Sequence, residues 1–546
     1  MGRQGLANES GDISGDISGD SSNVLGGVAL DPKRDRLVIL ASALGTVFEW
    51  YDFFIYGILA ALLGKLFFAT GNPTTELLFS LGAFAIGFLF RPLGAVLFGY
   101  FGDRVGRKYT FLITISLMGG ATAAIGFLPT QASIGVAAPL LMLLLRALQG
   151  LALGGEYGGA AIYVAEHAPA GKRGQYTSWI QASVAGGFLL SIFVVLSTRA
   201  LISEADFAEW GWRVPFLVSL LLLAGSLYIR LKLKESPVFQ AMKAAGTTSK
   251  NPIKDSFADR ANIGNILVAL FGVAAGLTVI YYTSQFGTLY FLQGTSRIPE
   301  TQALIFMAIG ALLAAPLYVF FGWVSDHIGR KRLLLIGYGL TLVLIFPLFR
   351  MMGDAANPAL GEATRANPVV IELPVCDYSV FGKPKTDCAR GLSFLSKRGI
   401  DHEKLASADL ALVVGSERIS GFDEASWNAA LLAAGYPDKA DPARVNGLVV
   451  VLAVAAMVAL SAMTYGQVAA ILVELFPARV RYTSMSIPYH IGTGYFGGFL
   501  PVVSQYIVVR TGDAYAGLWY TFGVVLMAFI VSAIWLPETR GRDISL

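Results

Sequence analysis

The stretch GYFGDRVGRK, residues 99–108, and its echo GWVSDHIGRK, residues 322–331, decide the architecture of this chain. Each copy joins two apolar segments through a short basic loop, in which glycines permit close helix packing and a tight turn. A second matched pair, EHAPAGKRGQYTS from Glu166 and ELFPARVRYTS from Glu474, shares the pattern E-x-x-P-A-x-x-R followed by Y-T-S. The chain is therefore built from two related halves. The second pair is spaced more widely than the first, which predicts an insertion in the second half.

The composition is that of a membrane protein. Hydrophobic residues make up 55% and charged residues 14% of the 546 positions, whereas about 25% of the residues of a soluble domain are charged. A membrane-spanning helix needs roughly 20 apolar residues. This criterion predicts twelve spanning helices, arranged as six, a linker and six, near residues 36–64, 78–101, 109–128, 138–164, 176–198, 213–231, 262–292, 301–323, 333–351, 447–472, 484–508 and 514–537.

The polar segments between the spans give the domain organisation. Residues 1–33 repeat the motif GDIS and are expected to form a disordered cytoplasmic tail. Residues 34–231 are predicted to form the first six-helix bundle, 232–261 a cytoplasmic linker, and 262–546 the second bundle. The second bundle is interrupted by residues 352–446, whose charges, prolines and helix-like piece DEASWNAALLAAGY indicate an insert outside the membrane. This insert is expected to cap the external mouth, to contact a partner, or merely to be tolerated in its place.

The distribution of Lys and Arg predicts the orientation in the membrane. Basic residues gather in loops on the cytoplasmic side, and one set of loops carries Lys33, Arg34, Arg36, Arg104, Arg107, Lys108, Lys172, Arg173, Lys250, Lys254, Arg260, Arg330, Lys331, Arg332, Arg479, Arg481, Arg540 and Arg542. The opposite loops 66–77 and 129–137 contain neither Lys nor Arg. Both termini are therefore expected in the cytoplasm and the insert outside it. In that oxidising compartment Cys376 and Cys388 are predicted to form a disulfide, with two free thiols as the alternative.

The paired G-x-x-x-D-R-x-G-R-K loops resemble those of the major facilitator superfamily of transporters, except that His327 replaces the usual basic residue in the second copy. The phrases FEWYDFFIYG, FLFRPLGA, RALQGLALGGEYGGA, GWRVPF, LKESPVF and ELFPARVRYTSMS resemble the metabolite:proton symporter branch of that superfamily. The resemblance implies an all-α membrane protein with twelve transmembrane helices in two pseudo-symmetric six-helix bundles. It also implies proton-driven uptake across the bacterial cytoplasmic (inner) membrane of a metabolite such as α-ketoglutarate, citrate, shikimate, proline or betaine.

Two carboxylates stand inside the first span, in VFEWYDFFIYG, residues 47–57. An ionised acid at the centre of a lipid-facing helix costs about 2.5–3.5 kcal/mol, so Glu49 and Asp52, one helical turn apart, are expected to face a shared site. A rise of roughly 1.5 Å per residue places Asp52 near the depth of Arg146 in the fourth span, and the sugar-porter branch has a similar Asp and Arg pair. Paired with Arg146, the Asp52 carboxylate stays ionised, whereas in a dry site without that partner it takes a proton. We therefore assign proton coupling to Asp52 with Arg146, or to Glu49; the alternative is a permanent structural ion pair.

Other polar residues inside the spans are candidates for substrate binding. Arg91 needs an anion, which a substrate carboxylate, Glu49 or Glu156 would supply. Glu156 is assigned to the proton-coupling group, as a relay or as the partner of a gate arginine. The seventh span is polar and aromatic, as cavity-lining helices often are, although such residues also form interfacial belts or pack within a bundle. The remaining candidates for substrate binding are Tyr56, Gln181, Tyr281, Tyr282, Gln285, Tyr489 and His490.

The repeated loops are candidates for a cytoplasmic gate. Asp103 is expected at the N-terminus of the eleventh span and Asp326 at that of the fifth, where the helix dipole favours a carboxylate. By resemblance, these contacts hold the cytoplasmic side closed; the alternative is that the arginines only fix the topology. The ion pairs expected there are Glu166–Arg107 and Glu474–Arg330, and the full gate set is Gly99, Asp103, Arg104, Arg107, Glu166, Arg173, Asp326, Arg330, Glu474 and Arg481.

The leading hypothesis is a proton-coupled symporter that imports a small organic acid, such as a di- or tricarboxylate, by alternating access of a central site. The alternatives are a proton-coupled carrier of betaine or proline, a uniporter, and a non-transporting sensor that uses residues 352–446 as a ligand-binding ectodomain. No G-x-x-x-x-G-K-[ST] motif occurs, so the proton gradient is expected to supply the energy, and no cofactor, metal site or enzymatic activity is expected. The net charge of +4 is too small to suggest nucleic-acid binding. The expected partners are the organic acid, protons and the lipid bilayer, and the chain is expected to be a monomer.

Overall fold

The computed structural model describes residues 32–544, except 106, 156, 170, 233–251, 382–383 and 479. It describes the backbone alone for residues 32–43, 99–105, 107–108, 111, 229–230, 232 and 252–253. The predicted tail and most of the predicted linker therefore lie outside the described residues.

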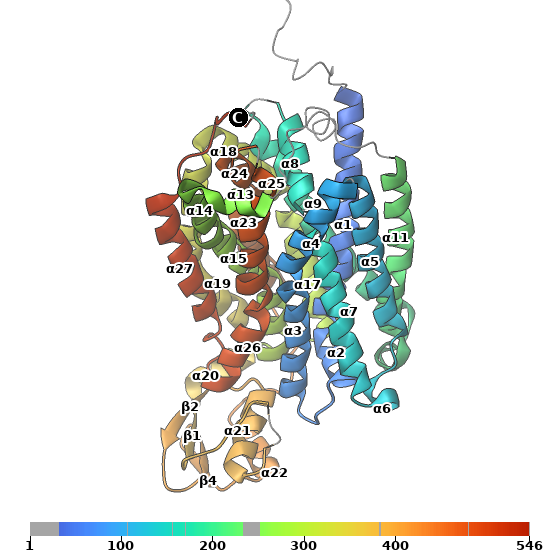
Figure 1. Cartoon of the computed structure of the whole chain (residues 1–546). Coiled ribbons are helices and arrows are strands. Elements are labelled where there is room, and N and C mark those ends of the chain that lie inside the picture. The colour runs from blue at the N-terminus through green and yellow to red at the C-terminus, as the bar shows by residue number, and fades with distance from the viewer. Residues whose placement is uncertain are drawn as a thin grey trace, which may run out of the picture.

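The first half of the chain forms a helical bundle, drawn in blue to green in Figure 1. Its first span breaks after Ile58, where two helices meet at an angle of 63°. Its second span is interrupted at Phe90, directly before Arg91 and Pro92, and Pro92 lacks the N–H group that would donate to the Phe88 carbonyl four residues earlier. The helices of this bundle are α1 Pro32–Ile58, α2 Ala60–Phe67, α3 Pro73–Leu89, α4 Arg91–Val105, α5 Arg107–Phe127, α6 Gln131–Ile134, α7 Ala137–Gly154, α8 Tyr157–His167, α9 Arg173–Leu201, α10 Glu204–Asp206, η1 Phe207–Gly211 and α11 Arg213–Lys232.

The second half forms a second bundle, whose seventh and eleventh spans contain π-helical segments. Such segments leave the regular α-helical hydrogen-bond pattern and are frequent at functional sites. The helices that precede the insert are α13 Pro252–Ala258, α14 Arg260–Leu267, η2 Val268–Ala274, α15 Ala275–Tyr282, η3 Thr283–Gly287, α16 Thr288–Tyr290, η4 Phe291–Thr295, α17 Glu300–Ala314, α18 Pro316–Ile328 and α19 Arg330–Ala356. Those that follow it are α23 Gly447–Tyr465, α24 Val468–Leu475, α25 Arg481–Ile491, η5 Gly492–Gly498, α26 Leu500–Thr511 and α27 Leu518–Trp535.

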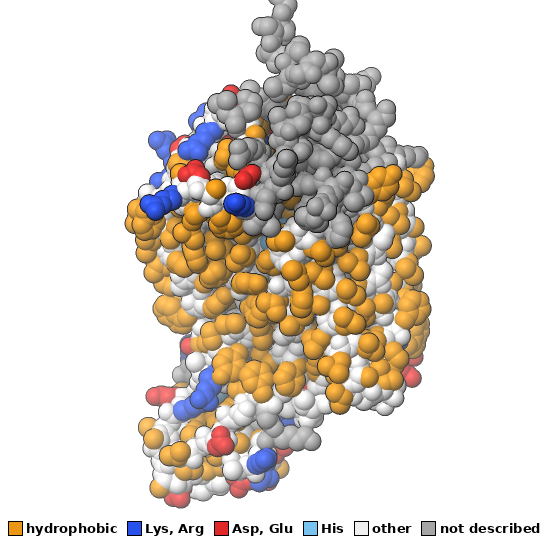
Figure 2. All heavy atoms as spheres, in the orientation of Figure 1, with side chains coloured by type: hydrophobic (Ala, Val, Ile, Leu, Met, Phe, Trp, Pro, Cys, Tyr) orange, Lys and Arg blue, Asp and Glu red, His pale blue; other side chains and the backbone are white. Residues whose placement is uncertain are grey.

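Each of the twelve predicted spans is mostly helical over its described residues. Eight helices there are long and apolar enough to cross a membrane, or ten when each of two bent pairs counts as one span. The two other predicted spans correspond to α5, with its apolar stretch Leu112–Phe127, and to the broken helix α25–η5–α26. Figure 2 shows hydrophobic side chains over the middle of the visible face, as a surface in contact with lipid requires. The predicted fold, two six-helix bundles of a multi-pass membrane protein, is confirmed.

The insert between α19 and α23 is a small α/β unit at one end of the molecule (Figure 1). Its four-stranded sheet has the order β2-β1-β3-β4, with β1 parallel to β2 and antiparallel to β3. The predicted helix is present as α22, but the sheet and two further helices were not predicted. The elements are α20 Pro358–Ala366, β1 Val369–Leu373, α21 Asp387–Lys397, β2 His402–Ala406, β3 Ala411–Val414, β4 Glu417–Ser420 and α22 Glu424–Ala433. We call this end of the molecule the insert end. The opposite end, where α18 ends (Figure 1), carries Arg330, Lys331 and Arg540, and we call it the basic end.

Candidate functional site

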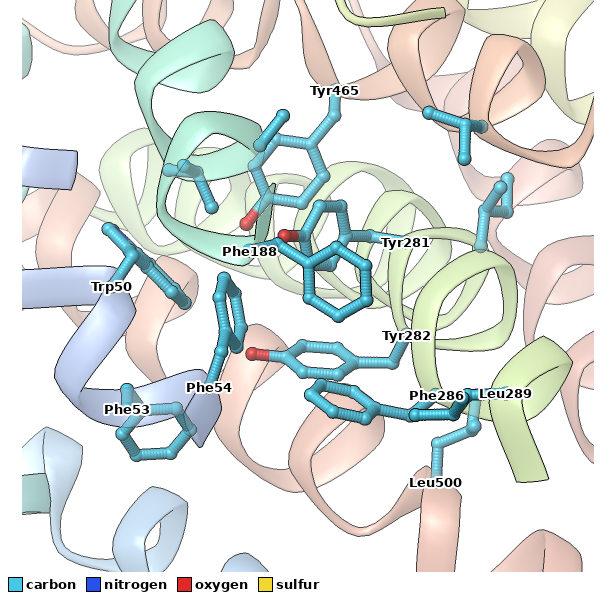
Figure 3. Close-up of a cluster of buried hydrophobic side chains, with 14 of the residues drawn as sticks. Trp50, Phe53, Phe54, Phe188, Tyr281, Tyr282, Phe286, Leu289, Tyr465 and Leu500 are labelled. Atoms are coloured by element: carbon cyan, nitrogen blue, oxygen red, sulfur yellow. The ribbon is translucent and has the colours of Figure 1, made fainter. Parts of the chain in front are cut away.

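A cluster of buried aromatic residues lies where the two bundles meet (Figure 3). Figure 3 shows Tyr282 and Phe286 of the second bundle facing Phe53 and Phe54 of α1. The Phe54 ring is 5.8 Å from that of Phe286 and 6.1 Å from that of Tyr281. All these side chains are buried. The cluster therefore closes the centre of the protein in this conformation.

Arg91 enters this region from the first turn of α4 and is 1% exposed. Its guanidinium carbon lies 4.2 Å from the ring centroid of Phe88, 4.9 Å from that of Phe53 and 5.0 Å from that of Trp50. Its Nε and Nη2 atoms have no hydrogen-bond partner among the described residues. A buried guanidinium with two unpartnered nitrogen atoms is poised for an anionic ligand, because guanidinium groups match carboxylates in shape and charge.

A small cavity of about 20 Å³ adjoins Arg91. This volume holds a water molecule but no metabolite, so the site is occluded in this conformation. Glu49 of the first bundle and His490 of the second both line it, and neither ring nitrogen of His490 has a hydrogen-bond partner within the described part of the chain. The lining residues are Thr46, Glu49, Trp50, Arg91, Leu153, Tyr157, Ala160, Ile180, Tyr489 and His490.

Asp52 and Arg146 do not form an ion pair with each other in this conformation. Arg146 donates from Nη1 to Gln149 Oε1 at 2.7 Å and from Nη2 to the Phe84 carbonyl at 3.3 Å. Its guanidinium carbon is 4.5 Å from the ring centroid of Tyr56. Asp52 Oδ1 has no hydrogen-bond partner among the described residues. If the proposed switch operates, this structure represents its separated state.

The two acids of α1 are sheltered from lipid. Glu49 is 6% and Asp52 is 5% exposed, so both carboxyl groups lie inside the protein. Glu156, by contrast, lies outside the described residues, so the structure does not place it.

The predicted polar candidates fall into two groups. Tyr56 donates to the Ser80 carbonyl at 3.2 Å, and Gln181 donates from Nε2 to Tyr157 Oη at 2.9 Å, so both have partners within the bundle. Tyr281 Oη and both amide atoms of Gln285 are buried without a partner in the described chain. Buried polar atoms without a hydrogen-bond partner are unfavourable. A bound ligand could supply the missing hydrogen bonds, as expected of a substrate-binding site.

Tyr157 is a site residue that the sequence reasoning missed. Its ring stacks on that of Tyr489 with centroids 3.8 Å apart, and Tyr489 Oη is 2.9 Å from Tyr465 Oη. The stack joins α8 of the first bundle to α25 of the second. The only sequence signal was its place in the glycine-flanked phrase GGEYGG, directly after the break between α7 and α8.

At the basic end, Asp326 joins the two bundles. Its carboxylate accepts from the backbone N–H groups of Gly174 and Gln175, each at 2.8 Å, at the N-terminus of α9. This is the helix-terminus contact that the sequence predicted. The helices are close enough there that a Cβ added to Gly174 would lie 2.4 Å from the Gly322 carbonyl oxygen, so only glycine fits.

A buried ion network surrounds this contact. Arg330 pairs with Asp326 at 2.8 Å and with Glu474 at 3.2 Å. Arg173 of the first bundle lies 3.9 Å from Glu474, and Thr539 also donates to Glu474. The predicted pair Glu474–Arg330 is therefore present, within a network that closes the basic end.

A second connection at the basic end joins Glu166 to Arg481 at 3.4 Å, across the two bundles. Glu166 was predicted to pair with Arg107, whose side chain is outside the described residues. The side chains of the other gate candidates in that loop, Asp103 and Arg104, and the surroundings of Gly99 are likewise not described. The structure therefore places the second-half copy of the gate motif and leaves the first-half copy as a prediction.

The insert end is also closed between the bundles. Arg199, near the end of α9, forms ion pairs with Glu204 at 2.7 Å and with Glu300 at the start of α17. Tyr290 donates to the Gly57 carbonyl at 2.7 Å, which joins α16 to α1. With both ends closed and a nearly filled centre, the structure is an occluded conformation.

Two pseudo-symmetric helical bundles around a buried charged centre define a membrane transporter of the major facilitator superfamily. The model of the family described as "Sugar (and other) transporter" matches residues 37–266 and 426–546, and the chain belongs to this family. The matched residues leave out 267–425, a range that contains most of the insert.

Several relatives are similar over most of their length. The chain is 37% identical to the shikimate transporter of Escherichia coli (strain K12) over 321 residues, which cover 59% of this chain and 73% of that protein. It is 28% identical to a putative proline/betaine transporter of Staphylococcus haemolyticus over 526 residues, which cover 94% of this chain and 92% of the relative. The crystal structure of a D-xylose-proton symporter superposes with a TM-score of 0.60 over 93% of this chain and 99% of that chain. Its 17% identity shows the shared fold alone.

Proposed function

We propose that this chain is a proton-coupled symporter that imports a small organic acid by alternating access. The observation that carries the proposal is Arg91, a buried guanidinium with two unpartnered nitrogen atoms beside a cavity that Glu49 and His490 also line. The relatives named as shikimate and proline/betaine transporters, and the fold shared with a proton symporter, support transport of a small polar solute. In this proposal the basic end faces the cytoplasm with both termini, the protein is a monomer in the bacterial cytoplasmic membrane, and the proton gradient is its energy source.

The aromatic residues favour an acid over a quaternary ammonium compound. A trimethylammonium group binds best to the faces of aromatic rings. Near the cavity those faces are already in contact with cations: Arg91 lies over Trp50, Phe53 and Phe88, and Arg146 over Phe53, Tyr56 and Phe84. Two fixed guanidinium groups would repel a third cation in the same low-dielectric space. An anion would instead neutralise them.

Coupling to protons follows from the acids of α1. A carboxylate that is buried without a counter-ion is unfavourable, and taking up a proton removes the charge. We infer that Asp52, whose Oδ1 has no hydrogen-bond partner among the described residues, is protonated in the occluded state, and that a change of conformation which brings a guanidinium to this carboxylate releases the proton. Glu49 stays the alternative carrier of the proton. Substrate and proton then cross in the same cycle, because the site closes only after the proton has neutralised the carboxylate.

A second candidate, a carrier of proline or betaine, is supported by the relative that matches 94% of the chain. The two candidates predict different substrates for the same purified protein. In proteoliposomes with an imposed pH gradient, we expect accumulation of shikimate, α-ketoglutarate or citrate, abolished by a protonophore, and no accumulation of glycine betaine. Accumulation of betaine but of no acid would select the osmolyte carrier, and uptake that ignores the pH gradient would select a uniporter.

Arg91 tests the binding mode. Arg91→Gln removes the cation, and we expect uptake of the acid to fall at least tenfold. Arg365→Gln is the matched control, because Arg365 is exposed and lies in the insert. Ligand-induced thermal stabilisation without any uptake by wild-type protein would favour the sensor hypothesis and contradict transport.

A further inference from the structure

The insert is fastened to the end of the second bundle by several polar contacts. Asp401 Oδ1 accepts from the Ala514 N–H at 2.6 Å, His402 N–H donates to the Gly512 carbonyl at 3.1 Å, and Lys404 Nζ donates to the Arg510 carbonyl at 2.6 Å. The three residues of the bundle in these contacts lie at the end of α26 or in the loop that follows it. The insert is also joined covalently to α19 and α23 of the same bundle. We call these contacts the anchor.

Among the described residues, the hydrogen bonds between the insert and the first bundle are made at the start of α3. Thr75 Oγ1 donates to the Val380 carbonyl at 2.8 Å, and Asn72 Nδ2 donates to Ser393 Oγ at 3.3 Å. Leu78, which is 1% exposed, belongs to the hydrophobic core of the insert rather than to that of its own bundle. We call these contacts the foot.

Phe381 of the insert lies against both bundles at once. Its ring stacks on Phe79 of α3 with centroids 5.8 Å apart, and on Tyr506 of α26 with centroids 5.7 Å apart. Val509 of α26 and Leu78 of α3 are both buried in the core of the insert. Helices α3 and α26 also pack against each other. The insert therefore covers the line along which the two bundles meet at this end.

We propose that the insert is an external clamp on alternating access: it stays on the second bundle and must release α3 before the central site can open outward. The inference rests on the proposed alternating access and on the proposed orientation of the insert end. Outward opening separates the outer ends of the two bundles, so one set of insert contacts must break. The foot breaks, because the anchor is covalent as well as hydrogen-bonded while the foot consists of two hydrogen bonds and a few apolar contacts.

The clamp also explains why a folded unit occupies this position. Most of the insert lies in the range 267–425, which the family model does not match. Its core is completed by side chains from both bundles, which ties the fold of the insert to one conformation of the transporter. An insert without a mechanical role would be expected to fold on its own core and to contact a single bundle.

Cysteine pairs test the clamp. The probe is a cysteine introduced at a buried position by Gln285→Cys. A membrane-impermeant thiol reagent is added outside, and the rate at which it labels this cysteine reports outward opening. The measurement needs neither substrate nor a proton gradient. A disulfide between Asn72→Cys and Ser393→Cys, whose native side chains are in contact, locks the foot. We expect external labelling at position 285, followed by mass spectrometry of the peptide that contains it, to be at least tenfold lower than in the two variants that carry only one of these cysteines. The matched control is Asp401→Cys with Ala514→Cys, which locks the anchor and is expected to leave labelling within twofold.

A weakened foot gives the opposite result. Phe381→Ala removes the ring that lies against both bundles, and we expect external labelling of the probe to rise several-fold. Val375→Ala is the matched control, because Val375 is an exposed apolar residue of the same insert. Labelling that ignores the locked foot, or that responds equally to Phe381→Ala and Val375→Ala, would overturn the clamp. Labelling needs no substrate, so the two proposals are tested separately. A negative labelling result contradicts the clamp and not the organic-acid proposal, and a negative substrate assay contradicts the organic-acid proposal and not the clamp.

Discussion

The ring of Tyr157 lies flat on that of Tyr489, with centroids 3.8 Å apart and 8° between the ring planes. The two residues come from different bundles and both line the cavity beside Arg91. Helix α8 runs from Tyr157 to the gate residue Glu166, and α25 begins at the gate residue Arg481. The stack therefore stands between the cavity and the basic end, and forms an inner barrier that must part before substrate leaves toward that end.

Loss of the Tyr157 ring is expected to weaken this barrier. Tyr157→Ala removes the stacking contact, so we expect a cysteine at Gln285 to be labelled several-fold faster from the basic end, and the accumulation ratio of the substrate in proteoliposomes to fall. Tyr157→Phe keeps the ring and loses only the hydroxyl that accepts from Gln181, so it is expected to stay within twofold of wild type. Equal labelling of the Ala and Phe variants would show that the stack is not a barrier.

The acids of α1 are expected to carry the coupling. With Asp52→Asn the site has no proton to release, so accumulation against a gradient is expected to disappear while exchange of labelled for unlabelled substrate continues within about threefold of wild type. Asp354→Asn is the control, because Asp354 is exposed and pairs with exposed Arg365, away from the central site. Full accumulation by Asp52→Asn would show that the assignment is wrong. If Glu49→Gln then loses accumulation, the coupling belongs to Glu49.

The parts of the site that were predicted well are those marked by repeated local motifs. Asp326 and Glu474 were placed correctly because each motif fixes a loop at one end of the bundle, and pseudo-symmetry then supplies the neighbouring helix terminus. The contact between Asp52 and Arg146 was inferred from depth and from the resemblance to the sugar-porter branch. Depth along a span does not determine the direction of a side chain, and Arg146 finds neutral partners on its own bundle instead.

Other features depend on contacts that are distant in the sequence. The stack of Tyr157 on Tyr489 joins the two halves of the chain, and nothing near Tyr157 announces its partner. The strands of the insert are four or five residues long, too short for a clear alternation of polar and apolar residues. Its core also borrows Leu78 and Val509 from the bundles, so the sequence of the insert alone does not contain the whole pattern.

The network around Arg330 is expected to matter for stability. Removing one partner of a buried ion pair leaves the other charge uncompensated, which costs about 3–5 kcal/mol. Arg330→Gln removes the cation that pairs with Asp326 and Glu474. We therefore expect it to lower the free energy of unfolding in detergent by about 3–5 kcal/mol. Arg365→Gln breaks an exposed pair with Asp354, for which about 0–1 kcal/mol is expected. Similar losses in the two variants, measured by chemical denaturation, would show that the buried network contributes no more than a surface pair.

The anchor of the insert is expected to respond to pH through Asp401. Burial, with a smaller effect from neighbouring Asp513, raises the pKa of Asp401 from 3.8 to about 6 in the folded protein, while the hydrogen bond from the Ala514 N–H partly offsets this. The folded state therefore binds the proton more tightly than the unfolded state, and this group adds stability as the pH falls from about 6 to about 4.

Asp401→Asn removes this titration and keeps an oxygen that accepts from Ala514. Burial lowers the pKa of His402, the adjacent residue, below 6.5, so His402 acts in the opposite direction in both proteins and cancels in their difference. We expect the stability of wild type relative to Asp401→Asn, followed by hydrogen exchange in the insert, to increase by on the order of 2 kcal/mol across that interval. A stability difference between the two proteins that stays constant from pH 7 to pH 4 would show that Asp401 does not take up the proton.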